Sequence, residues 1–235
     1  MRGLFLPASP LKPTVGLLMK KYRTIVADPP WHYDEFCQIH KKAGRVTKPL
    51  PYQSMSLDEI KSLAVQEMAD KDCRLFLWTT NKYLPNAFDV MAAWGFEYKQ
   101  TIIWHKQGNP SPWGGSVAPN HAEFLLVGVR GKPARKSMLK SNVISVNVQR
   151  HSSKPNAFID YIEMVSESPY LEIFSRAARL GWDVWGNEVS PNVEIPVRSL
   201  TNACTGLAVV SASPSESTLE GFTGQVGLSQ PTANQ

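Results

Sequence analysis

The sequence predicts an α/β fold: one domain built on a doubly wound, mostly parallel sheet of seven strands. Short β-branched or aromatic runs, typical of buried strands, alternate along the chain with segments of helical length and periodicity. Such alternation is typical of a parallel sheet covered by helices. The pattern ends near residue 190, where Ser, Thr, Gly, Pro and Gln begin to dominate. We therefore expect an N-terminal extension (1–21), one domain (22–190) and a disordered low-complexity tail (191–235).

Composition narrows the class of protein. With 235 residues, 43% of them hydrophobic, the chain can bury the core of one domain. A net charge of +5 favours polyanionic partners, although a solvated basic surface is the alternative. The cysteines Cys37, Cys73 and Cys204 show neither disulfide nor zinc spacing, which indicates a reduced, cytoplasmic protein without a metal. No apolar run reaches the roughly 18–20 residues of a membrane span, so no membrane association is expected.

The first strand is predicted at Tyr22–Ala27, and it leads directly into Asp28-Pro29-Pro30-Trp31. Two prolines stop the strand because neither can donate to a sheet ladder. Asp28 therefore lies at the carboxyl end of a strand, where open α/β sheets bind their ligands. Its carboxylate could accept an N–H of an exocyclic amine, a carbonyl of Pro29-Pro30 could accept the other, and Trp31 could stack on the base. The alternative is a structural turn with Trp31 in the core.

Two long loops supply further candidates for binding. The loop 32–51 carries Lys41, Lys42 and Arg45, which could hold phosphates, although a solvated loop is the alternative. The Gly/Pro-rich loop 106–120 carries Trp113, a second aromatic candidate for substrate contact.

The remaining elements follow in order. Ser56 to Glu59 matches a capping box, so a helix is predicted from there to about Met68. Gly95 is placed to end a helix that begins near Leu84. A further helix is expected at 154–166, and strands at 74–78, 97–105, 123–129, 143–146, 170–174 and 182–185. The strands at 97–105 and 123–129 are expected to be antiparallel because no helix separates them.

Several short motifs stand in one order along the chain. They are Ala27-Asp28-Pro29-Pro30-Trp31, Pro51-Tyr52 with Met55-Ser56, Leu75-Phe76-Leu77-Trp78, Ile103-Trp104, Glu123 with Leu126-Val127-Gly128-Val129, His151 to Pro155, Glu172-Ile173-Phe174-Ser175-Arg176 and Trp185-Gly186-Asn187-Glu188. Over about residues 22–190, this ordered set resembles the adenine-N6 methyltransferases of the MT-A70 group, and it is most like the prokaryotic and phage DNA members.

The resemblance implies a Rossmann-like methyltransferase fold with circularly permuted motifs, in which the catalytic strand comes first and the cofactor strand, 170–174, comes late. It implies S-adenosylmethionine as the methyl donor, Asp28 with Pro29-Pro30 as the cradle of the target amine, and Trp31 as its stacking wall. Tyr52 and Glu123 match positions near the acceptor base. The positions expected around the cofactor are Asp28, Lys154, Arg176, Arg179, Asn187 and Glu188.

Two departures from the family pattern affect this assignment. No Asp or Glu precedes Asp28 to contact the cofactor adenine, and Ala178-Arg179 stand where the eukaryotic enzyme has histidine and asparagine. Local alternatives also exist: Lys154 could be an ordinary lysine at a helix start, and Arg176 a surface ion.

The expected reaction is methyl transfer from S-adenosylmethionine to N6 of adenine in nucleic acid. DNA is favoured over RNA because the chain is compact and lacks zinc fingers. The alternatives are an RNA adenosine N6-methyltransferase, a catalytically silent nucleic-acid-binding subunit, and a methyltransferase for a small or protein amine. The resemblance also allows a homodimer.

Overall fold

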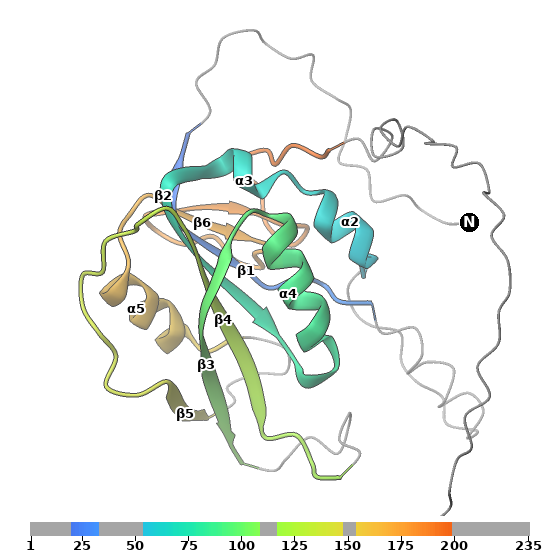
Figure 1. Cartoon of the computed structure of the whole chain (residues 1–235), viewed down its shortest axis with the longest axis vertical. Coiled ribbons are helices and arrows are strands. Elements are labelled where there is room, and N and C mark those ends of the chain that lie inside the picture. Colours follow the sequence, from blue (N-terminus) through green and yellow to red (C-terminus); the bar gives the residue numbers. More distant parts are fainter. Residues whose placement is uncertain (1–19, 33–53, 109–116, 148–153, 199–235) are drawn as a thin grey trace, which may run out of the picture. The chain divides into compact units, whose positions relative to one another are not determined.

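The central feature of the fold is a seven-stranded sheet with the strand order β5-β3-β4-β2-β1-β6-β7 (Figure 1). This computed structural model describes residues 20–32, 54–108, 117–147 and 154–198. The strands are β1 (Tyr22–Ala27), β2 (Ala69–Thr79), β3 (Glu97–Gln107), β4 (Ala122–Arg130), β5 (Val143–Asn147), β6 (Tyr170–Ile173) and β7 (Trp182–Trp185). Among them only β4 runs against the others, pairing antiparallel with both β2 and β3. The predicted mostly parallel α/β sheet, including the antiparallel β3–β4 pair, is confirmed.

Helices cover both faces of the sheet, and each face has its own apolar core (Figure 1). On one face α2 (Leu57–Ser62), α3 (Val65–Met68) and α4 (Leu84–Ala93) pack on alternate residues of the central strands, such as Ile25. On the other face α5 (Asn156–Val165) packs with Trp78 and Trp104. The short helix η1 (Asn81–Tyr83) joins β2 to α4. Because strand side chains alternate between faces, Ile25 and Val26 belong to different cores.

The helix predicted from Ser56 to Met68 is two helices. Its start is as expected, because the Ser56 side chain accepts from the Glu59 backbone and the Glu59 side chain accepts from the Ser56 N–H at 2.7 Å. The break lies at Leu63, which is extended, and at Ala64, whose N–H donates to the carbonyl of Pro196 at 2.8 Å. A distant segment thus takes a donor that a continuous helix would use internally.

The same contact bears on residues 191–198, where the C-terminal tail was predicted to start. Residues 191–198 pack on the domain: Ile195 is 6% exposed, and the Arg198 N–H donates to the carbonyl of Ser62 at 2.8 Å. The Asn192 side chain accepts from the Val184 N–H at 2.7 Å. Residues 191–198 are therefore held on the domain by backbone hydrogen bonds to the break between α2 and α3 and by the Asn192 side chain. Residues 199–235 lie outside the described residues.

The structure also describes one of the three cysteines and the lengths of the helices. Cys73 is a free, buried cysteine, and burial raises the pKa of its thiol to about 12. Within the part of the chain described, no helix has the length and apolar character needed to cross a bilayer.

The central position of Leu75 gives a test of the core. Leu75 on β2 is 0% exposed, so we expect Leu75→Ala to lower the free energy of unfolding by about 2–5 kcal/mol through lost contacts and a cavity. Denaturant titration measures this change. Leu180→Ala is the control because Leu180 is 100% exposed, and it should change stability little. Equal losses for both variants would contradict the assigned core.

Candidate active site

Side chains from three separate segments meet at the carboxyl edge of the sheet. Asp28 directly follows β1, and β1 pairs with β6 up to Ala27 and Ile173. Glu123 lies at the start of β4, and because β4 is antiparallel its start falls at the edge where β2 and β3 end. Lys154 precedes α5. In the sheet, β1 lies between β2, the next strand along the chain, and β6, which the chain reaches only after α5. The strand order therefore reverses at β1, and open α/β sheets bind their ligands in the crevice at such a reversal.

The turn after Asp28 is held by backbone hydrogen bonds. The Asp28 N–H donates to the Ile173 carbonyl at 3.4 Å, which ties the turn to β6. The Trp31 N–H donates to the Pro29 carbonyl at 2.8 Å, and the Met55 N–H donates to the Pro30 carbonyl at 2.9 Å. Each carbonyl has a second lone pair, so either can still accept another N–H. The rigid turn expected from the two prolines is thus anchored on both sides.

Trp31 is part of the core in this structure. Its side chain is 5% exposed, its ring stacks on Tyr83 at a centroid distance of 5.6 Å, and its Nε1 donates to the Trp78 carbonyl at 3.3 Å. Little of the ring is open to a planar base. This environment supports the packing role that the sequence left as the alternative to a stacking wall.

A line of alternating charges extends from Asp28. Lys154 Nζ lies 2.9 Å from Asp28 Oδ2 and 3.1 Å from Glu123 Oε2, and Lys106 binds Glu123 Oε1. Burial lowers the pKa of Lys154, but Asp28 and Glu123 outweigh it and hold that pKa above its usual range. Burial raises the pKa of Glu123, but Lys154 and Lys106 together hold it below its usual range. Lys154 is therefore a cation and Glu123 a carboxylate at neutral pH, which excludes Lys154 as a proton acceptor.

On the other side of Asp28, β6 contributes a carboxylate that the sequence analysis did not single out. Glu172 Oε2 lies 3.9 Å from Arg179 Nε, close enough for attraction but too far for a hydrogen bond. Both atoms are buried and have no hydrogen-bond partner among the described residues. Burial raises the pKa of Glu172, an effect that Arg179 and Ser175 oppose and Asp28 reinforces. This pair presents an open acceptor and an open donor beside Asp28.

The loops after β6 and β7 touch backbone to backbone. Phe174 has φ 65°, which is uncommon for a residue with a side chain, and so turns the chain sharply out of β6. Ser175 then donates its N–H to the Trp185 carbonyl at 3.0 Å. A Cβ at Gly186 would lie 2.2 Å from the Ser175 carbonyl oxygen, so this approach requires glycine. Just beyond it, Arg176 Nε lies 3.6 Å from Glu188 Oε1.

The structure brings together most of the predicted site residues that it describes. Asp28, Glu123 and Lys154 form one group, Arg176 and Glu188 another, and Arg179 is beside Glu172. Asn187 is exposed next to Glu188. The sequence analysis missed Lys106 and Glu172, although Lys106 stands two residues after Trp104 in a strand and therefore on the same face. The candidates outside the described residues are Lys41, Lys42, Arg45, Tyr52 and Trp113.

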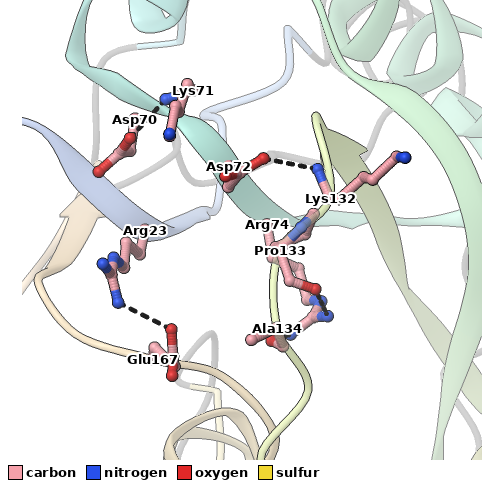
Figure 2. A pocket seen from close by; sticks show the side chains of 9 residues that line it. All are labelled: Arg23, Asp70, Lys71, Asp72, Arg74, Lys132, Pro133, Ala134 and Glu167. Atoms are coloured by element: carbon pink, nitrogen blue, oxygen red, sulfur yellow. Dashed lines mark hydrogen bonds and ion pairs between the residues drawn. The ribbon is translucent and has the colours of Figure 1, made fainter.

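A cavity of about 250 Å³ lies at the opposite end of the strands, lined by residues such as Arg23, Arg74 and Glu167 (Figure 2). Both arginines that line it have partners in the protein: Arg23 pairs with Glu167 at 2.9 Å, and Arg74 donates to four protein oxygens. It is formed near the start of β1, whereas Asp28 follows its end, so we exclude it as the catalytic site. Within the described residues, no group of three His, Cys, Asp or Glu side chains is placed to hold a metal ion.

The seven-stranded sheet, its flanking helices and the Asp-Pro-Pro-Trp turn define a Rossmann-like methyltransferase. The MT-A70 family model matches residues 22–188, and the chain belongs to the MT-A70 family, as the ordered motifs predicted.

Relatives of the chain differ in how much of them it covers. It is 33% identical to the type II methyltransferase M.MunI of a Mycoplasma species over 197 residues. The aligned region covers 76% of this chain and 83% of the relative. It is 30% identical over 186 residues to the human N(6)-adenosine-methyltransferase catalytic subunit METTL3, covering 73% of this chain and 29% of that protein. A rice MT-A70-like protein, a probable N(6)-adenosine-methyltransferase, is 29% identical over 74% of this chain and 24% of its own length. The chain thus spans only about a quarter of these plant and animal relatives.

The close approach at Gly186 gives a prediction for the cofactor side. Gly186→Ala should push the Ser175 loop away from Trp185, because the added Cβ meets backbone, which cannot rotate away. If this loop binds S-adenosylmethionine, the methyl donor that the motif resemblance implies, its affinity should fall about 10-fold or more. Calorimetric titration measures the affinity. Leu180→Ala is the control, since Leu180 lies in the segment between β6 and β7 and is 100% exposed. If Gly186→Ala bound the cofactor as wild type does, this loop contact would have no role in binding.

Proposed function

We propose that this chain transfers a methyl group from S-adenosylmethionine to the exocyclic N6 of adenine in nucleic acid, with DNA as the favoured polymer. The observation that carries the proposal is the carboxylate of Asp28, partly open at 27% side-chain exposure, on a turn held by hydrogen bonds at the switch point of the sheet. The catalytic domain extends from about residue 22 to residue 198.

The amine of adenine is a poor nucleophile because its lone pair is delocalised into the ring. Asp28 Oδ2 already accepts from Lys154, so Oδ1 is the oxygen left to accept one N–H of the target amine. The Pro29 carbonyl, using its second lone pair, accepts the other. These contacts strengthen as positive charge develops on nitrogen, and they therefore stabilise the transition state more than the ground state. In a duplex the base must first leave the stack.

S-Adenosylmethionine supplies an electrophilic methyl group on a sulfonium. The residues on the β6 side of Asp28 fit such a ligand. Glu172 Oε2 can accept a hydrogen bond from it, and Arg179 Nε can donate one to it, because neither atom has a hydrogen-bond partner among the described residues. Arg176 and Arg179 would hold anionic or hydroxyl groups, and Glu188 with Asn187 would bind the ribose hydroxyls. Lys154, a partly buried cation beside Asp28, would orient the carboxylate end of the cofactor. Asp28, held by Lys154, would keep the target amine close to the cofactor side of the site.

The preference for DNA rests on the extent of the similarity. Type II methyltransferases modify DNA, and the chain matches M.MunI over most of both lengths. In contrast, it matches only about a quarter of the larger N(6)-adenosine-methyltransferases. An RNA adenosine methyltransferase is therefore the second candidate.

Transfer of labelled methyl from S-adenosylmethionine to adenine-containing DNA and RNA, followed by nucleoside analysis, tests the proposal. We expect N6-methyladenine in DNA and little in RNA. Label in RNA alone would overturn the preference for DNA. No label in either polymer and no binding of S-adenosylmethionine would favour the silent nucleic-acid-binding subunit, whereas no label with cofactor binding intact would point to a missing partner or sequence context.

Substitutions should separate the amine cradle from the cofactor contacts. Asp28→Ala removes the main acceptor of the amine, so we expect kcat to fall about 100-fold or more while cofactor affinity changes little. Glu188→Ala should do the reverse, weakening cofactor affinity with a smaller loss of kcat at saturation. Asp89→Ala, which removes an exposed carboxylate on α4, is the control and should leave both unchanged. Near-normal turnover by Asp28→Ala would mean that Asp28 is not the cradle.

A further inference from the structure

Lys106 lies at the end of β3, and neither the motifs nor the proposed reaction gives it a role. We propose that Lys106 is a positioning residue for that reaction: it holds Glu123 in place, so that Glu123 and Asp28 together hold Lys154. The inference rests on the proposed function, because its purpose is to fix the carboxylate that receives the target amine. Lys106 itself does not touch the reacting atoms.

The position of Lys106 follows from the register of two strands. Trp104 on β3 is directly opposite Glu123 on β4, so Lys106, two residues further along β3, points to the same face and is the diagonal neighbour of Glu123. The Lys106 N–H donates to the His121 carbonyl at 2.7 Å, which keeps the strands paired to this point. Its ammonium then binds Glu123 Oε1, while Lys154 lies 3.1 Å from Oε2. Both oxygens of one carboxylate are thus occupied by lysines from different segments.

Aromatic rings support both ammonium groups. Lys106 Nζ lies 4.8 Å from the centroid of Trp104, and Lys154 Nζ lies 5.2 Å from the centroid of Trp78. The two tryptophans contact each other edge to face at 6.2 Å, and both pack on Phe158 of α5. A ring face attracts a cation and restricts where its ammonium can lie. Lys106 therefore has a defined place, which a solvated surface lysine would not have.

The ion pair of Lys106 with Glu123 affects the protonation of Glu123. Glu123 has 15% side-chain exposure, and burial alone would favour its protonated form. Lys106 and Lys154 oppose this effect and hold the pKa of Glu123 below its usual range. Without Lys106, only Lys154 would oppose burial, and the pKa of Glu123 would rise. Once protonated, Glu123 would hold Lys154 less firmly, and Lys154 would no longer fix Asp28.

Charged and titratable groups lie near Glu123 on three neighbouring segments. Lys106 faces it from β3 and Lys154 from the residues before α5, with Asp28 beyond Lys154 at the end of β1. His121 precedes it by two residues and lies just before β4, and the ring centroid of His105 is 6.2 Å from that of His121. Lys106→Met keeps an unbranched apolar stem that is one atom shorter and removes the ammonium with its charge and its hydrogen bond to Glu123, whereas Lys106→Arg keeps the charge.

The first experiment does not require activity. The carboxyl ¹³C signal of Glu123, assigned by its loss in Glu123→Gln, is titrated with pH in wild type, Lys106→Met and Lys106→Arg. We expect the midpoint to move to higher pH in Lys106→Met and to stay near wild type in Lys106→Arg. Lys61→Met is the matched control: Lys61 has 29% side-chain exposure against 26% for Lys106, and it pairs with Asp89 on a distant helix. An unmoved midpoint in Lys106→Met would overturn the proposal.

The second experiment tests the positioning role through the pH profile of methyl transfer. Lys106→Met should lower kcat about 10- to 100-fold near neutral pH and move the acid limb to higher pH, with Lys106→Arg restoring both. A moved Glu123 midpoint with an unmoved acid limb would overturn the positioning role. If wild type transferred no methyl group, the proposed function would fail, whereas the ¹³C titration would still decide whether Lys106 controls the charge of Glu123.

Discussion

The contact of Lys154 with both Asp28 and Glu123 is the interaction on which the arrangement of the site depends. It joins the end of β1, the start of β4 and the segment before α5, which are far apart in the sequence. Charges in a partly buried place are costly unless they are paired, and removing one partner leaves the others uncompensated. The three groups therefore constrain one another, and the position of the carboxylate proposed to receive the amine is set by residues outside its own turn.

The antiparallel strand makes this arrangement possible. In an all-parallel sheet every strand would bring its end to the catalytic edge, but β4 brings its start, and with it Glu123. The neighbouring β3 ends at the same edge and brings Lys106. Two adjacent strands thus place a carboxylate and an ammonium side by side without any loop. Side chains on paired strands are positioned more rigidly than side chains on loops, which suits groups that must hold others in place.

Asp28 separates two environments with different chemistry. Toward β4 the charges are paired and supported by tryptophan rings, whereas toward β6 Glu172 and Arg179 have buried atoms without hydrogen-bond partners among the described residues. Paired groups restrict geometry, and unpaired buried groups favour a ligand that satisfies them. The proposed division, with the target base on the β4 side and the cofactor on the β6 side, follows from this difference.

The sequence by itself determined the strands, the capping box at Ser56, the antiparallel pairing of β3 with β4, and the place of Asp28 after β1, because each depends on local propensity or on neighbours in the chain. Its ordered motifs also determined the family. The tertiary structure alone decided the break at Ala64, the packing of residues 191–198, the burial of Trp31 against Tyr83 and the pairing of Lys106 with Glu123. Each of these depends on a partner that is distant in the sequence or on another strand, and local pattern carries no information about which distant groups will meet.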